Sequence, residues 1–346
     1  MPQQTANDAQ GQVEAWIALQ HDLDKAPNTV AAYARGITDF TTFCHARGID
    51  PLDVNKGTIA AYLGDLRARP PGGGRAGRAG GSSPQSGPPS NASLRHRLTI
   101  VRLFYDHLVE EGLRTMNPVP RGRRGVFDGA RHRGERGLVP VHRPLPWIPS
   151  DAQWRAILDA ARLEPVRNRL MLALAYDCAL RREELCALET SDLDPAHRLV
   201  TIRAETTKTR AGRVVPYSAV TGDLLAAYLR ERRALGRARG RLFLSTSPRN
   251  RGRPIGKWTW SKVVRALGRR ADAPALGTHT MRHLCLTDLA RVGWDIHEIA
   301  RFAGHRSVQS TLLYIHLSAR DLSAKFAATA AELHEARLAA IAEADR

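Results

Sequence analysis

Residues 279–316 read HTMRHLCLTDLARVGWDIHEIARFAGHRSVQSTLLYIH, and this stretch predicts helices that follow one another across short turns. Asp295 and Glu298 are spaced as in a capping box and mark the start of one helix. Gly304 is typical of the end of that helix, and Ser307 can begin the next. The stretch therefore predicts a helical domain in which the turn at Gly304 has a defined shape.

Two basic side chains at the start of this stretch share one helix face. His279 and Arg282 are three residues apart, so a phosphate could bridge their imidazole and guanidinium groups. His279 and His283 have the spacing of a zinc-binding pair, but Thr280 stands where that motif requires glutamate, and Arg282 would repel a cation. We therefore expect no metal site here. A single tyrosine such as Tyr314 is by itself more often a structural residue than a nucleophile.

Two further patterns precede this stretch. Arg181 stands where one helical run ends and another begins, and Glu184 follows three residues later; Glu184 could hold the guanidinium for phosphate binding, or the two could form an ordinary surface pair. Lys208 lies in a turn between residues 198–203 and 213–217, two β-rich runs that predict an antiparallel hairpin. Only six of the 52 basic residues are lysine, and lysine, unlike arginine, can release a proton.

Taken in order, these patterns resemble the tyrosine recombinases, the phage integrase family. The match consists of A-L-R-x-x-E-L, a lysine in a hairpin before V-V-P, H-T-x-R-H, and G-H-x-S with a tyrosine nine residues after its histidine. The resemblance covers nearly the whole chain. It departs from the family at Ala179, where glycine is common, and at Ala303, where leucine is usual.

The resemblance implies DNA strand exchange without a cofactor, metal or ATP. A tyrosine attacks the phosphodiester and forms a 3′-phosphotyrosine, which keeps the bond energy so that another 5′-hydroxyl can rejoin the strand. Arginines aimed at the phosphate stabilise the developing charge. By position, the family implies Arg181 and Arg282 as the phosphate clamp, His279 and His305 in phosphate and proton transfer, Lys208 as general acid, Tyr314 as nucleophile and Glu184 as a supporting residue.

The composition is consistent with a DNA-binding protein. The chain has 346 residues, 43% of them hydrophobic, which is enough for two globular domains and excludes wholesale disorder. It carries 52 Lys and Arg against 34 Asp and Glu, a formal net charge of +18. This excess predicts a polyanionic partner, here double-stranded DNA, although a solvated basic surface would give the same total.

The domain organisation follows from periodicity and composition. Residues 1–118 predict a four-helix unit that carries a flexible Gly/Pro/Ser insert at 69–91. A basic linker covers 119–147. Residues 148–346 predict an α+β unit with a small antiparallel sheet and a helical tail at 320–346, so the chain as a whole is mainly α. The family resemblance implies that the first unit is a SAM-like core-binding domain and the second the catalytic domain. In the first domain, the apolar faces are Tyr33, Ile37, Phe40 and Cys44; Ile59, Tyr62, Leu63 and Leu66; and Leu94, Leu98, Val101, Tyr105 and Leu108.

The linker contains seven arginines between residues 121 and 143, against Asp128 and Glu135. Such a segment is suited to lie along a phosphate backbone, although a soluble tether would look alike. The candidate backbone contacts are Arg121, Arg123, Arg124, Arg131 and Arg133.

Further expectations concern location and assembly. The polar start of the chain does not resemble a secretory signal, and no apolar run is long enough to span a bilayer, so a cytoplasmic, DNA-associated bacterial protein is expected. The family implies a tetramer on two DNA sites, with accessory proteins possible. Two alternatives stay open, namely a catalytically silent DNA-binding protein on the same fold and DNA relaxation of the type IB topoisomerase kind.

Overall fold

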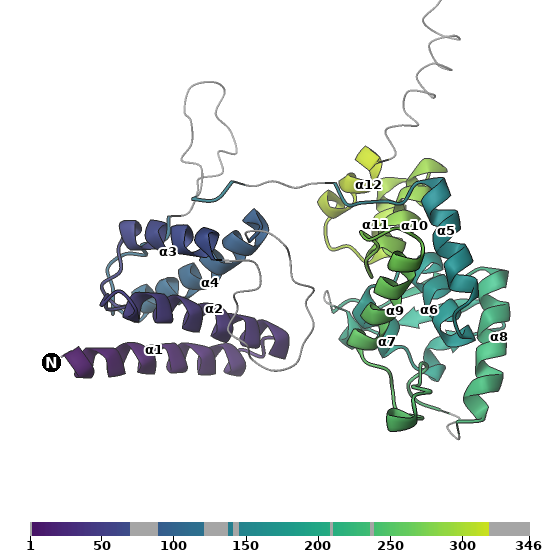
Figure 1. Cartoon of the computed structure of the whole chain (residues 1–346), viewed down its shortest axis with the longest axis horizontal. Helices are drawn as coiled ribbons and strands as arrows, with labels where there is room; N and C mark the ends of the chain where they lie inside the picture. Colours follow the sequence, from purple (N-terminus) through teal and green to yellow (C-terminus); the bar gives the residue numbers. More distant parts are fainter. Residues whose placement is uncertain are drawn as a thin grey trace, which may run out of the picture. The chain divides into compact units, whose positions relative to one another are not determined.

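The computed structural model describes residues 2–69, 89–120, 138–140, 145–207, 210–235 and 239–317. The chain divides into two compact units, Met1–Arg143 and Pro144–Arg346 (Figure 1). Several predicted features lie outside the described residues: most of the Gly/Pro/Ser insert, Lys208, the C-terminal tail, and the arginines at 121, 123, 124, 131 and 133.

The first unit is made of helices in the described residues. Asn55 and Ser90 cap two of them by accepting hydrogen bonds from backbone N–H groups, which is the usual role of these residue types at a helix start. Gly48 and Gly112 take positive φ angles of 63° and 71° just beyond helix ends, a conformation that glycine adopts readily. The helices are α1 (Pro2–Asp22), α2 (Pro27–His45), α3 (Lys56–Ala68) and α4 (Asn91–Glu110).

Aromatic side chains fill the core of this unit. Phe40 contacts the ring edges of Tyr62 and Tyr105, and Trp16 packs against Phe104. Every residue of the three predicted apolar faces is buried except Tyr33, which is partly buried and stacks on Trp16. Helix α1 already begins at Pro2, although the polar residues at its start show no apolar period.

The second unit combines helices with one small sheet, which confirms the predicted α+β class. The strands β1 (Leu193–Asp194), β2 (Leu199–Ile202) and β3 (Arg213–Pro216) are antiparallel in that order, and Val200 lies opposite Val215. The predicted hairpin is β2–β3, whereas the two-residue β1 was too short to predict. The helices are α5 (Asp151–Arg162), α6 (Val166–Asp177), α7 (Arg182–Ala187), α8 (Ala219–Arg233), α9 (Lys257–Arg270), α10 (Thr280–Arg291), α11 (Ile296–Ala303) and α12 (Leu312–Leu317).

Helix α6 lies at the centre of this unit. Leu170, Met171, Leu172 and Leu174 are all buried, so the helix has apolar contacts around most of its circumference. A second, smaller cluster lies beside the main core. It consists of Ala179, Cys285, Leu286, Ala290, Ile299, Ala303 and Tyr314, and it brings together the segments that carry the predicted catalytic residues.

None of the described helices is both long enough and apolar enough to span a lipid bilayer.

Candidate active site

Arg282 is buried on α10 and is held by main-chain oxygens. Its side chain is 3% exposed, and its two terminal nitrogens donate to the carbonyl oxygens of Ala179 and Ala303, each at 2.6 Å. Burial lowers the pKa of Arg282 to about 10, and the positive charge of Arg181 acts in the same direction. The guanidinium therefore stays charged at neutral pH, with its plane fixed between the turn before α7 and the end of α11.

Arg181 is the N-cap residue of α7, where the sequence places a helix start. Its Nη1 donates to Glu184 Oε1 at 2.7 Å, and its Nη2 donates to the carbonyl oxygen of Gly304 at 3.3 Å. Glu184 also accepts the backbone N–H of Arg181 at 3.0 Å, and it is only 1% exposed. The carboxylate is buried and the Arg181 side chain is only 19% exposed, so this is not an ordinary surface pair.

Arg213 is a further member of this cluster that the sequence analysis missed. It begins β3, its side chain is 7% exposed, and its Nη2 donates to Glu184 Oε2 at 2.8 Å. Burial alone would raise the pKa of Glu184, but Arg213 and Arg181 together lower it to about 2. One carboxylate thus contacts two guanidinium groups and leaves a net positive charge in the cluster. No local pattern points to Arg213, because an arginine at the edge of a short strand is normally exposed.

Tyr314 on α12 lies between two imidazoles. It is 3% exposed, and its hydroxyl is 3.0 Å from Nδ1 of His283. The ring of His305 stacks on the phenol with an interplanar angle of 8° and a centroid distance of 6.1 Å. Nδ1 of His305 is 2.8 Å from the hydroxyl oxygen of Thr311, which fixes that ring. The sequence points to His283 through its spacing from His279 and its place in the H-T-x-R-H pattern, but not as a partner of Tyr314.

The histidines of this cluster are neutral at neutral pH. Burial, reinforced by the charge of Arg282, lowers the pKa of His283 and of His305 to about 4. Burial also lowers the pKa of His279, whose ring centroid lies 6.4 Å from that of His283. Burial raises the pKa of Tyr314, whereas the positive charge of Arg282 opposes that rise. The phenol therefore keeps its proton at neutral pH unless a neighbouring group takes it.

The chain also resembles known proteins in sequence. Residues 150–320 match the model of the phage integrase family. The chain is 28% identical over 326 residues to tyrosine recombinase XerC of Pseudomonas fluorescens, covering 92% of this chain and 95% of that protein. The chain belongs to the phage integrase family of tyrosine recombinases.

Solved structures share the fold of this tyrosine recombinase. The XerH site-specific recombinase bound to a palindromic difH substrate has a TM-score of 0.63 at 18% identity, covering 89% of this chain and 81% of that one. The Tn1549 transposon integrase in complex with transposon right end DNA has a TM-score of 0.64 at 16% identity, covering 92% and 99%. Both confirm the fold class.

Most of the predicted site residues of the recombinase meet in one place. Arg181, Glu184, Arg282, His305 and Tyr314 form the cluster, and His279 lies at its edge beside His283. Within the described residues, no three His, Cys, Asp or Glu side chains are grouped so that they could hold a metal ion.

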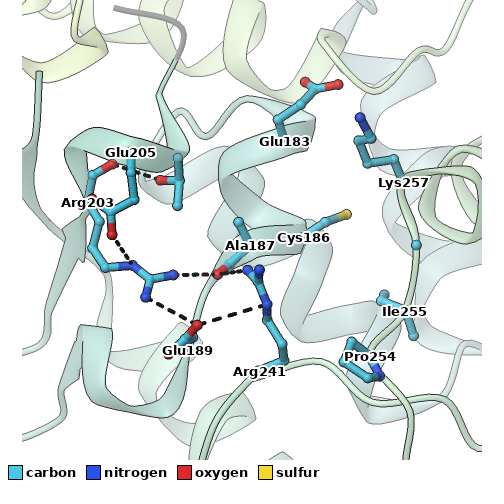
Figure 2. A pocket seen from close by; sticks show the side chains of 12 residues that line it. Glu183, Cys186, Ala187, Glu189, Arg203, Glu205, Arg241, Pro254, Ile255 and Lys257 are labelled. Carbon is cyan, nitrogen blue, oxygen red and sulfur yellow. Dashed lines mark hydrogen bonds and ion pairs between the residues drawn. The ribbon is translucent and has the colours of Figure 1, made fainter. Parts of the chain in front are cut away.

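A cavity of about 640 Å³ is lined by Glu183, Cys186 and Ala187 of α7 and by residues outside that helix (Figure 2). Arg203 and Arg241 both donate to the carbonyl oxygen of Ala187 and both lie near a carboxylate oxygen of Glu189, at 3.2 and 3.9 Å. The side chains of Glu183 and Lys257 lie near each other beside this cavity (Figure 2). Because carboxylates already balance these arginines, the cavity is poorly suited to bind phosphate.

Proposed function

We propose that this tyrosine recombinase breaks and rejoins DNA strands at specific sites, with Tyr314 as the nucleophile. The observation that carries the proposal is the position of the Tyr314 hydroxyl, buried in one cluster with the guanidinium groups of Arg181 and Arg282. A tyrosine with this environment can attack a phosphodiester whose non-bridging oxygens the two arginines bind. The products would be a 3′-phosphotyrosine and a free 5′-hydroxyl.

The arginines are prepared for this task before DNA binds. Arg282 uses one N–H of each terminal nitrogen on the carbonyls of Ala179 and Ala303, and a guanidinium has five N–H groups. The remaining donors can face a phosphate without reorganisation, which is the main source of electrostatic catalysis. Arg181 is held in the same way by Glu184 and by the Gly304 carbonyl. We assign the protonation of the leaving 5′ oxygen to Lys208.

We infer double-stranded DNA as the partner and a tetramer on two sites as the working assembly. The net charge of +18 favours a polyanion, and the arginine-rich segment from 121 to 143 would add contacts to the phosphate backbone. The helical unit Met1–Arg143 would serve as the core-binding domain. Acting on chromosomal or mobile-element DNA would place the protein in the bacterial cytoplasm.

The test uses labelled DNA from the sequences that flank the coding region, nicked to trap intermediates, in buffer without Mg²⁺. We expect a protein–DNA adduct that survives denaturation with the native chain and is absent with Tyr314→Phe. DNA binding without an adduct on any flank would favour a silent DNA-binding protein. Relaxation of supercoiled DNA without strand exchange would favour a topoisomerase.

A further inference from the structure

His283 is in direct contact with the proposed nucleophile. Its Nδ1 lies 3.0 Å from the Tyr314 hydroxyl, a distance at which the phenol can donate a hydrogen bond to an imidazole nitrogen. The backbone N–H of His283 donates to the carbonyl oxygen of His279 within the first turn of α10, so the ring is anchored on a regular helix. The neighbouring side chain, Arg282, is fixed by two carbonyls.

We propose that His283 is the general base that takes the Tyr314 proton during DNA cleavage and returns it during rejoining. This inference rests on the proposed function. It adds a catalytic residue to the set that the family resemblance implies, in which His279 and His305 are the proton-transferring histidines.

Cleavage by this route moves two protons and exchanges one bond at phosphorus. The Tyr314 O–H bond breaks as a bond forms between the proton and Nδ1 of His283. The phenolate oxygen attacks phosphorus, and the bond from phosphorus to the 5′ oxygen breaks. That oxygen leaves with a proton from a separate general acid, which we assign to Lys208. In the rejoining step the 5′-hydroxyl gives its proton to the now neutral Lys208 amine as its oxygen attacks phosphorus. The bond from phosphorus to the tyrosine oxygen breaks, and the His283 imidazolium returns its proton to that oxygen.

The other two histidines are less well placed for this task. The His305 ring lies parallel to the phenol with its centroid 6.1 Å away, and its Nδ1 contacts Thr311, so no described hydrogen bond joins a nitrogen of that ring to the Tyr314 hydroxyl. No described hydrogen bond joins His279 to the phenol, and its ring centroid lies 6.4 Å from that of His283. His283 is therefore the histidine whose ring nitrogen contacts the reacting oxygen.

The electrostatic surroundings are compatible with a base. Burial keeps the pKa of His283 low, so the ring is neutral and able to accept a proton at neutral pH. A bound phosphate would add negative charge beside the ring and so favour the imidazolium that forms. The charged and titratable groups of the cluster are Arg181, Glu184, Arg213, His279, Arg282, Cys285, His305 and Tyr314.

The first test requires no DNA. A neutral His283 that accepts from Tyr314 carries its proton on Nε2, and ¹⁵N NMR of histidine-labelled protein distinguishes the two tautomers. Assignment comes from the signals lost in His283→Gln. We expect the Nε2–H tautomer at pH 7. A proton on Nδ1 would make His283 a donor to Tyr314 and would overturn the proposal.

The second test measures single-turnover adduct formation on DNA that the native chain cleaves. His283→Ala removes the contact, whereas His283→Asn places an amide oxygen near the position of Nδ1, which can accept a hydrogen bond but not a proton. We expect both variants to slow adduct formation by about 100-fold or more at pH 7. Because tyrosine ionisation must then precede attack, their rates should rise about tenfold per pH unit between pH 7 and 9. The exposed residue His297 provides the control His297→Ala.

A modified substrate separates the base from the acid. When sulfur replaces the bridging 5′ oxygen, the leaving group needs no proton, so the substrate should restore cleavage by Lys208→Ala but not by His283→Ala. Native-like rates for a folded His283→Asn, or rescue of His283→Ala by the sulfur substrate, would refute the base role. Absence of any adduct with the native chain would instead refute the proposed function, and the tautomer measurement would still decide the position of the proton.

Discussion

Replacing Glu184 with glutamine removes the carboxylate that both Arg181 and Arg213 contact, and we expect this change to destabilise the second unit strongly. The pKa of Glu184 falls from an ordinary value of 4.5 to about 2 in the folded chain. At ~1.36 kcal/mol per pKa unit, this difference corresponds to about 3 kcal/mol of stability at neutral pH. The loss of one partner from a buried ion pair costs a similar amount, ~3–5 kcal/mol.

Urea unfolding at pH 7, followed by tryptophan fluorescence, measures this effect. Trp260 is fully buried in the second unit and reports its unfolding. With an m-value of ~2 kcal/mol/M, the midpoint of Glu184→Gln should fall by about 1.5 M. The matched control is Asp159→Asn, which removes a 3.5 Å pair with Arg162 whose side chains are 68% and 80% exposed. Such a surface pair contributes less than about 1 kcal/mol.

The contribution of Glu184 to the free energy of unfolding should also depend on pH, with a defined sign. A carboxylate with a depressed folded pKa stabilises the native state above its unfolded pKa, and this stability is lost as the pH falls through the folded value. The native chain should therefore lose the Glu184 contribution between pH 4.5 and about 2, and Glu184→Gln should lack it. Equal midpoints for Glu184→Gln and Asp159→Asn at pH 7 would refute the reasoning.

Three further predictions concern the same cluster. Gly304→Ala should destabilise the chain by about 1–2 kcal/mol and slow adduct formation. The φ angle of Gly304 is +62°, and a Cβ at this position would lie 3.0 Å from Nη1 of Arg213. Urea midpoints and adduct rates measure the two effects. Ala179→Gly should change stability by less than about 1 kcal/mol, and a larger shift in the urea midpoint would contradict it. The free energy of unfolding should fall as the pH is lowered from 6.5 toward 4. His283 and His305 have folded pKa values of about 4, below the ordinary 6.5, so the unfolded chain binds protons more readily over this interval. A urea midpoint that rises as the pH is lowered would contradict that sign.

Periodic and capping signals in the sequence predicted most of the fold. The apolar spacing of α4 identified a buried face, and the Asp295 and Glu298 capping box is present with Gly304 in the left-handed conformation after it. The β2–β3 hairpin follows from two short β-rich runs. These features were accessible because each depends on residues within about one turn or one strand of each other.

The partners of the site residues could not be predicted in the same way. Arg213 reaches Glu184 across 29 positions of sequence, and His283 reaches Tyr314 across 31. Neither contact leaves a local pattern, because it depends on how β3, α7, α10 and α12 pack. The sequence motifs singled out Glu184 and Tyr314, but they did not show that Arg213 and His283 are the partners of these two residues.

Ala179 shows how a departure from the family pattern fits the same physics. Its φ is +46°, in the left-handed region, which costs an alanine ~1–2 kcal/mol relative to glycine. Its methyl group is fully buried against the cluster that contains Cys285, and burial of one such group contributes ~0.8 kcal/mol. Alanine also loses less backbone entropy than glycine on folding, by ~0.4–1 kcal/mol. These contributions nearly cancel the strain. Since Arg282 binds the carbonyl oxygen of this residue and not its side chain, alanine can occupy the position while the guanidinium keeps its acceptor.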